Sequence, residues 1–458
     1  MVLSRAMSRR ALWQSLYERF DPELPARGAW RADRPHTPAK RIIDSLAMPF
    51  GDPRILLTGT VGTGKTTELL RIAETQDQKE LVVFLDLYRH FAEVVRDSPA
   101  LDRISSWEVC FLASLAMVGT AKEKLGYEFP QTYLEDLERA WRKLAKATNT
   151  PEVQVDIGAM AKTLAGLAAP AVGAVLAGPP GAAVGASLSV SGGVAGALKN
   201  WVLPLGRSSR FLPDQDADMQ TLLACVNVLI GEFQHKSRRV LFVIDGLDRI
   251  RNIERAKELF VDSQLISQLA CRVIICAPFA LRHHIATPAV RGFEPVVLVN
   301  EPVLDHKNPQ RHGEGVGFFC DLFVRRTADM EGPPLIERSL LEELAYRSGG
   351  RARDFVRFIR ELAKVAWQAD VEVASADIVR RVIDEQRRIR ETGIHRGHIE
   401  LLEEIANDPE HRLPANPLAQ ELLNFQHLLP YPNESEWYYP HPLLTMHLVR
   451  PKPPGSAG

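Results

Sequence analysis

Short runs of consecutive apolar residues recur along the first two thirds of this chain, separated by longer stretches in which apolar residues return every three or four positions. The short runs predict strands that are buried on both faces, and the periodic stretches predict amphipathic helices. Strands joined by helices are typical of a parallel sheet covered by helices. We therefore predict a doubly wound α/β fold with strands at residues 54–58, 80–86, 238–245, 272–277 and 295–299.

The connection between the second and third predicted strands is much longer than a single crossover helix requires. Helical periodicity covers much of this connection, at residues 92–118, 120–147 and 216–234. A core of residues 51–310 with a helical, Gly/Ala-rich insertion at about 90–236 follows from this pattern.

An uncharged stretch inside the insertion, Thr163 to Leu198, consists mostly of Ala, Gly, Val, Leu, Ser and Pro. A membrane-spanning helix needs about 20 strongly apolar residues, whereas Pro170 and the turn at 178–181 divide this stretch into shorter pieces. Small residues four positions apart, such as Gly181 and Gly185, let neighbouring helices approach closely. Two interpretations of 163–198 stay open: a Gly-rich linker, or an element that drives assembly or enters a membrane after activation.

Both ends of the chain depart from the alternating pattern. Residues 1–50 combine one predicted helix, Ala11 to Phe20, with a proline-rich linker, and form an N-terminal strap. Residues 393–450 combine two amphipathic helices with a turn and a short aromatic run, which predicts a winged-helix-like module, and the Pro/Gly-rich tail 451–458 is predicted to be disordered. Between core and module, residues 311–392 are helical throughout, with predicted helices at 315–328, 337–347, 353–369 and 376–391, the last capped by Ser375.

Basic and acidic side chains nearly balance, with 56 lysines and arginines against 57 aspartates and glutamates, so no net field favours nucleic acid or an anionic membrane. The C-terminal module has eight acids against Arg396, Arg412 and Arg450, and we therefore do not expect it to bind nucleic acid. Five cysteines without motif spacing, and no continuous apolar segment near the N-terminus, predict a cytoplasmic protein with buried thiols.

The most specific motif lies between the first predicted strand and a predicted helix and reads Gly59-Thr60-Val61-Gly62-Thr63-Gly64-Lys65-Thr66. Its glycines let the backbone turn with N–H groups facing inward, so that a phosphate lies at the N-terminus of the next helix. In such a loop Lys65 reaches the β- and γ-phosphates, and the Thr66 hydroxyl ligates Mg²⁺. The motif predicts that residues 59–67, with Thr67 at the end, bind a nucleotide. Because the chain has no Asn-Lys-x-Asp guanine signature, ATP is favoured over GTP.

A second motif ends the third predicted strand and reads Asp245-Gly246-Leu247-Asp248. A carboxylate at the carboxyl end of a strand near the loop strand lies where ligands bind in parallel sheets. This position predicts that Asp245 holds Mg²⁺ through water, as a Walker B aspartate does.

Together these motifs resemble those of AAA+ and STAND-type P-loop ATPases. The phrase Ser348 to Phe355 is similar to the sensor 2 motif of AAA+ lids, with Gly350, Arg353 and Asp354 at the matching positions. The resemblance implies an ASCE-type sheet in which the strand 272–277 lies between the loop strand and the Walker B strand. It also implies that residues 311–392 form a helical AAA+ lid, that Arg353 senses the γ-phosphate, and that the strap packs against the adenine.

The Walker B region departs from the AAA+ pattern, because Gly246 stands where those proteins have a glutamate that polarises the attacking water. The form Asp-Gly-x-Asp is similar to NACHT-type STAND switches, and its end is similar to KAP ATPases; both imply Asp248 as the catalytic base. The usually polar sensor 1 position falls among Cys276, Ala277 and Pro278, of which only Cys276 could serve, and poorly. After Arg353, Arg249 and Arg351 are the next candidates for sensing phosphate. Because the groups that promote hydrolysis in AAA+ proteins are missing or displaced here, the resemblance implies slow hydrolysis of ATP.

Our leading hypothesis is an ATP- and Mg²⁺-dependent, slowly hydrolysing molecular switch that assembles as a homo-oligomer and signals to a protein sensor or effector. STAND and KAP relatives imply a role in antiviral defence. Two alternatives stay open: a replication-initiator-like DNA-binding ATPase, and a KAP-like membrane-associated ATPase whose membrane contact comes only from 163–198.

Overall fold

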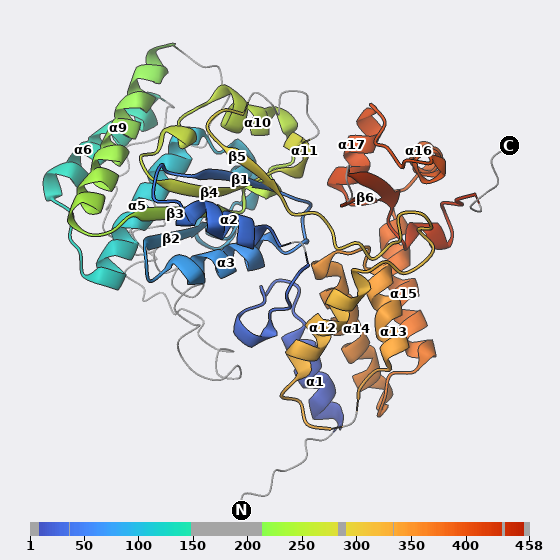
Figure 1. Cartoon of the computed structure of the whole chain (residues 1–458). Helices are drawn as coiled ribbons and strands as arrows, with labels where there is room; N and C mark the ends of the chain where they lie inside the picture. The colour runs from blue at the N-terminus through green and yellow to red at the C-terminus, as the bar shows by residue number, and fades with distance from the viewer. Residues whose placement is uncertain are drawn as a thin grey trace, which may run out of the picture. The chain divides into compact units, whose positions relative to one another are not determined.

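The computed structural model describes residues 9–35, 37–147, 213–282, 290–332, 334–432 and 436–452. The chain forms two compact units, which we describe separately (Figure 1). The sheet unit comprises residues 38–59 and 68–297, and the helical unit comprises residues 1–37, 60–67 and 298–458. The segment 163–198 lies outside the described residues, so both interpretations of it remain predictions. The domain boundaries expected from the sequence also remain a prediction.

The sheet unit is built on a parallel five-stranded sheet with the strand order β2-β3-β4-β1-β5. The predicted α/β fold is confirmed, and so is the extra strand, because β4 pairs with β1 on one side and with β3 on the other. The strands are β1 (Arg54–Thr58), β2 (Leu81–Asp86), β3 (Val240–Asp245), β4 (Arg272–Ala277) and β5 (Glu294–Val297). Strands in this register end at one edge of the sheet, which therefore carries both the start of the glycine-rich loop and the acidic end of β3.

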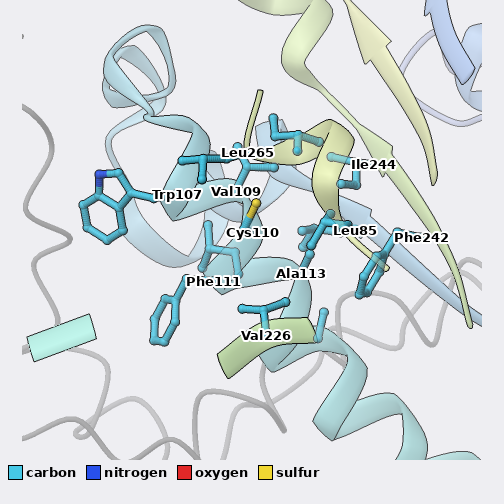
Figure 2. Packing of buried hydrophobic residues seen from close by; sticks show 14 of the residues in the cluster. Leu85, Trp107, Val109, Cys110, Phe111, Ala113, Val226, Phe242, Ile244 and Leu265 are labelled. Carbon is cyan, nitrogen blue, oxygen red and sulfur yellow. The ribbon is translucent and has the colours of Figure 1, made fainter. Parts of the chain in front are cut away.

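Helices of the insertion pack on the β2–β3 side of the sheet unit (Figure 1). Figure 2 shows Val109, Cys110, Phe111 and Ala113 of one helix beside Phe242 and Ile244 of β3. That helix, α5, is buried along most of its length, because it lies between β2 and another insertion helix. The helices of this unit are α2 (Pro38–Ala47), α3 (Lys65–Gln76), α4 (Leu87–Arg89), α5 (Ser106–Leu125), α6 (Gln131–Ala147), α9 (Pro213–Lys236), α10 (Ile253–Lys257) and α11 (Phe279–Arg282).

The predicted boundaries of the insertion helices at 92–118 and 120–147 were wrong. Helix α5 begins only after Ser105, whose capping box with Glu108 fixes its first turn, and it ends at Gly126 in a left-handed conformation. Its sides are apolar all round, so hydrophobic periodicity could not locate its ends. The helix α2 was not predicted, because Pro38 was interpreted as linker although proline is favoured in a first helical turn.

The helical unit contains the predicted helical region 311–392 and the C-terminal module. All four helices expected in that region are present, and Ser375 caps the last through its hydroxyl, 3.4 Å from the Ile378 amide. Helix α1 packs along α14, with the Trp13 indole donating to the Val371 carbonyl at 2.8 Å. The elements are α1 (Arg9–Arg19), α12 (Val316–Thr327), α13 (Arg338–Arg347), α14 (Ala352–Ala369), α15 (Ala376–Glu391), α16 (Arg396–Asn407), α17 (Pro417–Asn424), β6 (Leu428–Tyr431) and β7 (Trp437–Pro440).

The C-terminal module has the predicted order of two helices and an antiparallel hairpin, β6 and β7. Among the residues that the structure describes, no helix combines the length and apolarity needed to cross a membrane.

A buried carboxyl group in α5 predicts how the stability of the sheet unit depends on pH. Glu108 is fully buried, and its Oε2 accepts hydrogen bonds of 2.7 Å from both the amide and the hydroxyl of Ser105. Burial raises the pKa of Glu108 from 4.5 to about 7, so the native state keeps a proton that the unfolded chain releases. The stabilisation is therefore complete below pH 4.5 and is lost as the pH rises through about 7.

We expect Glu108 to contribute a fall of up to about 3 kcal/mol in the free energy of unfolding between pH 4.5 and 8, and we expect Glu108→Gln to lose this contribution while the slope from other buried carboxyl groups stays. Denaturant unfolding at several pH values measures both. Glu123→Gln, at an exposed position of the same helix, is the control that should keep the slope. An unchanged slope in Glu108→Gln would assign the pH dependence to another group.

Candidate functional site

The loop between β1 and α3 has the backbone shape that its sequence predicts. Gly62 and Gly64 have φ angles of 94° and 103°, which side-chain-bearing residues rarely adopt. Left-handed residues that alternate with right-handed ones form a concave nest lined by N–H groups, which binds anions. The Thr63 hydroxyl donates to the Thr60 carbonyl at 2.9 Å and closes the turn. The two left-handed glycines of the loop, Gly62 and Gly64, match this requirement, and the binding of phosphate by residues 59–67 stays a prediction.

The loop carbonyls accept hydrogen bonds from other segments of the helical unit. The Arg351 guanidinium donates to Val61 at 2.6 Å, and the Arg353 amide donates to Gly62 at 3.0 Å. The Arg34 guanidinium donates to the carbonyl of Thr63. Arg34 belongs to the strap, Arg351 is the N-cap of α14 and Arg353 lies in the first turn of that helix. The strap and the start of α14 therefore both donate to carbonyl groups of the loop.

Lys65, the predicted phosphate ligand, is only 4% exposed, and its Nζ donates to the Thr60 carbonyl at 2.9 Å. A cation removed from water needs acceptors or an anion close by, and the loop supplies a carbonyl. The ammonium group is thus held at the loop itself.

An amide side chain connects the loop with the C-terminal module. Asn300 Oδ1 accepts from the Thr60 hydroxyl at 3.1 Å, while its Nδ2 donates to the carbonyl of Pro430 in β6 at 3.0 Å. The residue is 1% exposed. Sequence reasoning missed Asn300, although a polar residue just after the last apolar run of the sheet was a signal that could have found it.

The lid motif around Gly350 is placed against the chain segment after β5. Gly350 has a φ of 77°, and a Cβ there would lie 2.0 Å from the Glu301 carbonyl oxygen, so only glycine fits. The side chain of Arg353, the predicted γ-phosphate sensor, lies 3.9 Å from Glu23 of the strap. Its neighbour Arg351 is the one whose guanidinium contacts the loop. The role of Arg353 as a sensor stays a prediction.

Asp354 lies at the centre of a buried charge cluster. Arg351 and Arg390 both bond Asp354 Oδ2, the latter at 2.9 Å, and His441 Nε2 lies 3.5 Å from the same oxygen. Burial acts to raise the pKa of Asp354, but the two guanidinium groups outweigh it and hold that pKa well below its usual range. The carboxylate is therefore charged at neutral pH and accepts hydrogen bonds from both arginines.

In the sheet unit, three carboxylates gather at the ends of neighbouring strands. Asp245, 4% exposed, accepts from the Gly246 amide at 2.8 Å, and it pairs in register with Asp86 of β2. Burial, with Asp245 and Asp248 nearby, raises the pKa of Asp86 to about 7. The sequence predicted roles for Asp245 and Asp248 but missed Asp86, although it was expected to end a strand.

These groups fit a magnesium ion in their chemistry, since Mg²⁺ prefers oxygen ligands and is commonly held by one or two carboxylates together with phosphate and water. Within the described ranges, no group of three or more His, Cys, Asp or Glu side chains forms a metal site by itself.

The geometry at Gly246 explains why the usual Walker B glutamate has no place here. The residue has a φ of 94°, and a Cβ would lie 2.4 Å from the Tyr88 amide nitrogen. Any side chain there would collide with backbone. Cys276, at the sensor 1 position, is fully buried in β4.

The strand order, the loop between β1 and α3, and the helical region after β5 are those of an AAA+-like P-loop fold. No known family and no curated protein matches the chain. Solved structures with some similarity include Drosophila ORC bound to DNA, with a TM-score of 0.39 and 12% identity over 89% of this chain and 74% of that one.

The Aeropyrum pernix ORC1 protein in complex with DNA has a TM-score of 0.38 and 12% identity, with 96% of each chain covered. The Thermotoga maritima RuvB Holliday junction branch migration motor has a TM-score of 0.26 and 15% identity over 51% of this chain and 84% of that one. Scores and identities this low assign neither a family nor a function to this chain.

We expect Gly246→Ala to destabilise the protein by about 2–4 kcal/mol, because the new Cβ strains the backbone and overlaps Tyr88. Gly231→Ala is the matched control: its Cβ meets nothing within 4 Å inside α9, and alanine should stabilise that helix by about 0.5–1 kcal/mol. Denaturant unfolding compares the two. Equal stability of both variants would refute the steric account.

Proposed function

We propose that this chain, which has an AAA+-like P-loop fold, binds ATP with Mg²⁺ and acts as a slowly hydrolysing molecular switch. The observation that carries the proposal is the outer side of the loop, where Val61, Gly62 and Thr63 accept hydrogen bonds from the lid and the strap. A ligand in the nest therefore acts on a loop that both segments already contact. In this proposal, ligand binding at the loop is coupled to the positions of the lid and the strap.

In this proposal residues 59–67 cradle the phosphates, and Lys65 neutralises the β- and γ-phosphate charge. The hydroxyl of Thr66 and the carboxylate of Asp245 would hold Mg²⁺, which screens the phosphate charge when bound. Support comes from the left-handed glycines of the loop and from the buried carboxylate at the end of β3.

Slow hydrolysis is proposed because no side chain fits at position 246 and the sensor 1 position holds a buried cysteine. The proposed base is Asp248. Asp86 is a second candidate, since it lies beside Asp245 in register and its raised pKa suits proton transfer near neutral pH. Arg353 is proposed to report the γ-phosphate through the lid, with Arg351 as the alternative.

The biological setting of the switch remains a hypothesis. Neither the fold nor the comparisons support the STAND-type or antiviral role implied by the Walker B resemblance. Assembly as a homo-oligomer and a protein sensor or effector partner are parts of the proposal that need direct measurement of mass with and without ATP.

A second candidate function is a DNA-binding ATPase of the replication-initiator type. It is favoured by the C-terminal module of two helices and a hairpin, which Asn300 connects to the loop. The acidic composition of that module opposes it. Retardation of duplex DNA at low salt, dependent on ATP and lost when residues 393–452 are absent, would favour this candidate over a protein partner.

Lys65→Ala should weaken ATP binding by at least about a hundredfold, because the phosphates lose a charge-assisted hydrogen bond in a dry site. Titration calorimetry with ATP and Mg²⁺ measures the loss. Lys79→Ala, an exposed lysine close in the chain, should bind as the unchanged protein does. Undiminished binding by Lys65→Ala would overturn the proposed function.

Asp248→Asn should lower the rate of hydrolysis by about 10²–10⁴-fold while ATP affinity stays within about threefold, because a base acts on water and not on the bound phosphate. Asp86→Asn is the matched variant, as it removes the neighbouring carboxyl group. Single-turnover hydrolysis separates the two. A loss confined to Asp86→Asn would move the base to β2, and full activity of both would place it elsewhere.

A further inference from the structure

We propose that Arg34 and Arg351 are positioning residues of the phosphate loop, which hold two of its peptide groups so that their N–H bonds face the nest. The proposal rests on the nucleotide binding proposed above. It gives a role to two arginines outside the phosphate-binding motif, one of them in a strap whose contacts with the loop the sequence did not predict.

In a trans peptide the carbonyl of one residue and the N–H of the next point in opposite directions, and the described chain contains no cis peptide bond. Arg351 bonds the Val61 carbonyl, so the Gly62 N–H points away from Arg351. Arg34 bonds the Thr63 carbonyl, so the Gly64 N–H points away from Arg34. Both glycine N–H bonds therefore point to the side of their peptides opposite the arginines, and in our proposal that side is the nest.

Arg34 is held in a fixed orientation. It is 8% exposed, its Nη1 lies 3.1 Å from Glu301, and its guanidinium lies 5.0 Å from the centre of the Phe318 ring. A Cβ on Gly64 would lie 2.8 Å from Arg34 Nη2, so the guanidinium packs directly against the glycine. Such close packing leaves the Thr63–Gly64 peptide little freedom to flip.

Arg351 is held in the same way from the lid. It is 3% exposed, pairs with Asp354, and donates to Gln426 at 3.0 Å. A Cβ on Gly62 would lie 2.9 Å from Arg351 Nη2. Burial lowers the pKa of Arg351 to about 10, which leaves it charged at neutral pH. Its partner Asp354 is also held by Arg390, so the ion pair does not depend on a single contact.

Preorganised N–H groups aid binding because the loop need not reorder when the anion arrives. If the arginines act in this way, their loss lowers the affinity for ligands that place a phosphate in the nest. The affinity for a ligand without phosphate then stays the same. If the arginines only support the fold, their loss lowers the affinity for both kinds of ligand, or it lowers the stability of the protein without changing either affinity.

The test compares ADP with adenosine. Arg34→Met is combined with Glu301→Gln, so that no unpaired carboxylate is left buried, and Glu301→Gln alone is the control that keeps the Arg34 bond to Thr63. For the lid, Arg351→Met is matched by Arg357→Met, a half-exposed arginine 3.7 Å from Asp354 that contacts no loop residue in the described structure. Titration calorimetry measures ADP, ligand-observed NMR measures adenosine, and thermal unfolding checks folding.

We expect ADP to bind about tenfold more weakly to the Arg34→Met/Glu301→Gln and Arg351→Met variants than to their controls, while adenosine binding changes by less than about twofold. Arg34→Lys should restore part of the affinity, because lysine can donate one hydrogen bond to Thr63. If the Arg34→Met/Glu301→Gln variant does not fold, Arg34→Lys serves as the test at position 34.

Three outcomes contradict the inference in distinguishable ways. If the unchanged protein binds neither ATP nor ADP, the proposed function fails and this inference fails with it. If the unchanged protein binds ADP and the variants bind like their controls, only the inference fails. If ADP and adenosine weaken equally, the arginines support the fold or the nucleoside and do not position the nest.

Discussion

Burying a guanidinium group is costly unless its N–H bonds find acceptors, and this constraint organises the helical unit. Arg34 and Arg351 are almost fully buried, and their acceptors include backbone carbonyls of the phosphate loop. The remaining acceptors come from Glu301, Asp354 and Gln426. The acceptors thus come from the loop, the segment after β5, the lid and the turn before β6, and displacing any one of these segments leaves a buried guanidinium group with fewer hydrogen-bond acceptors.

The sheet unit is governed by a steric constraint at the end of β3. The left-handed turn at Gly246 brings the backbone against Tyr88, which closes that position to a carboxylate. The nearest other carboxyl groups are Asp86, at the end of the neighbouring strand β2, and Asp248, in the turn that follows β3. The chemistry proposed for this edge of the sheet thus follows from how tightly two backbone segments approach each other.

The sequence predicted what is local and periodic. Strands such as β3 are continuous apolar runs, and the lid helices carry clear polar faces, so both followed from the pattern. The phosphate loop and the Gly350 turn follow from short motifs. Arg34 and Asn300 could not be found in this way, because their roles come from contacts between segments far apart in the chain. Asp86 was missed for the same reason: its partner lies on a different strand.

The amide of Asn300 and the bond from Arg351 to Gln426 have a consequence for communication within the helical unit. Asn300 joins Thr60 of the loop to Pro430 in β6, and Arg351 joins Val61 of the loop to Gln426, which lies just before β6. Both connections run from the loop to the C-terminal module, so they are a physical route by which binding at one place changes the free energy of binding at the other. Because coupling is reciprocal, a molecule that displaces the hairpin would change affinity at the loop by the same factor by which a loop ligand changes affinity at the hairpin.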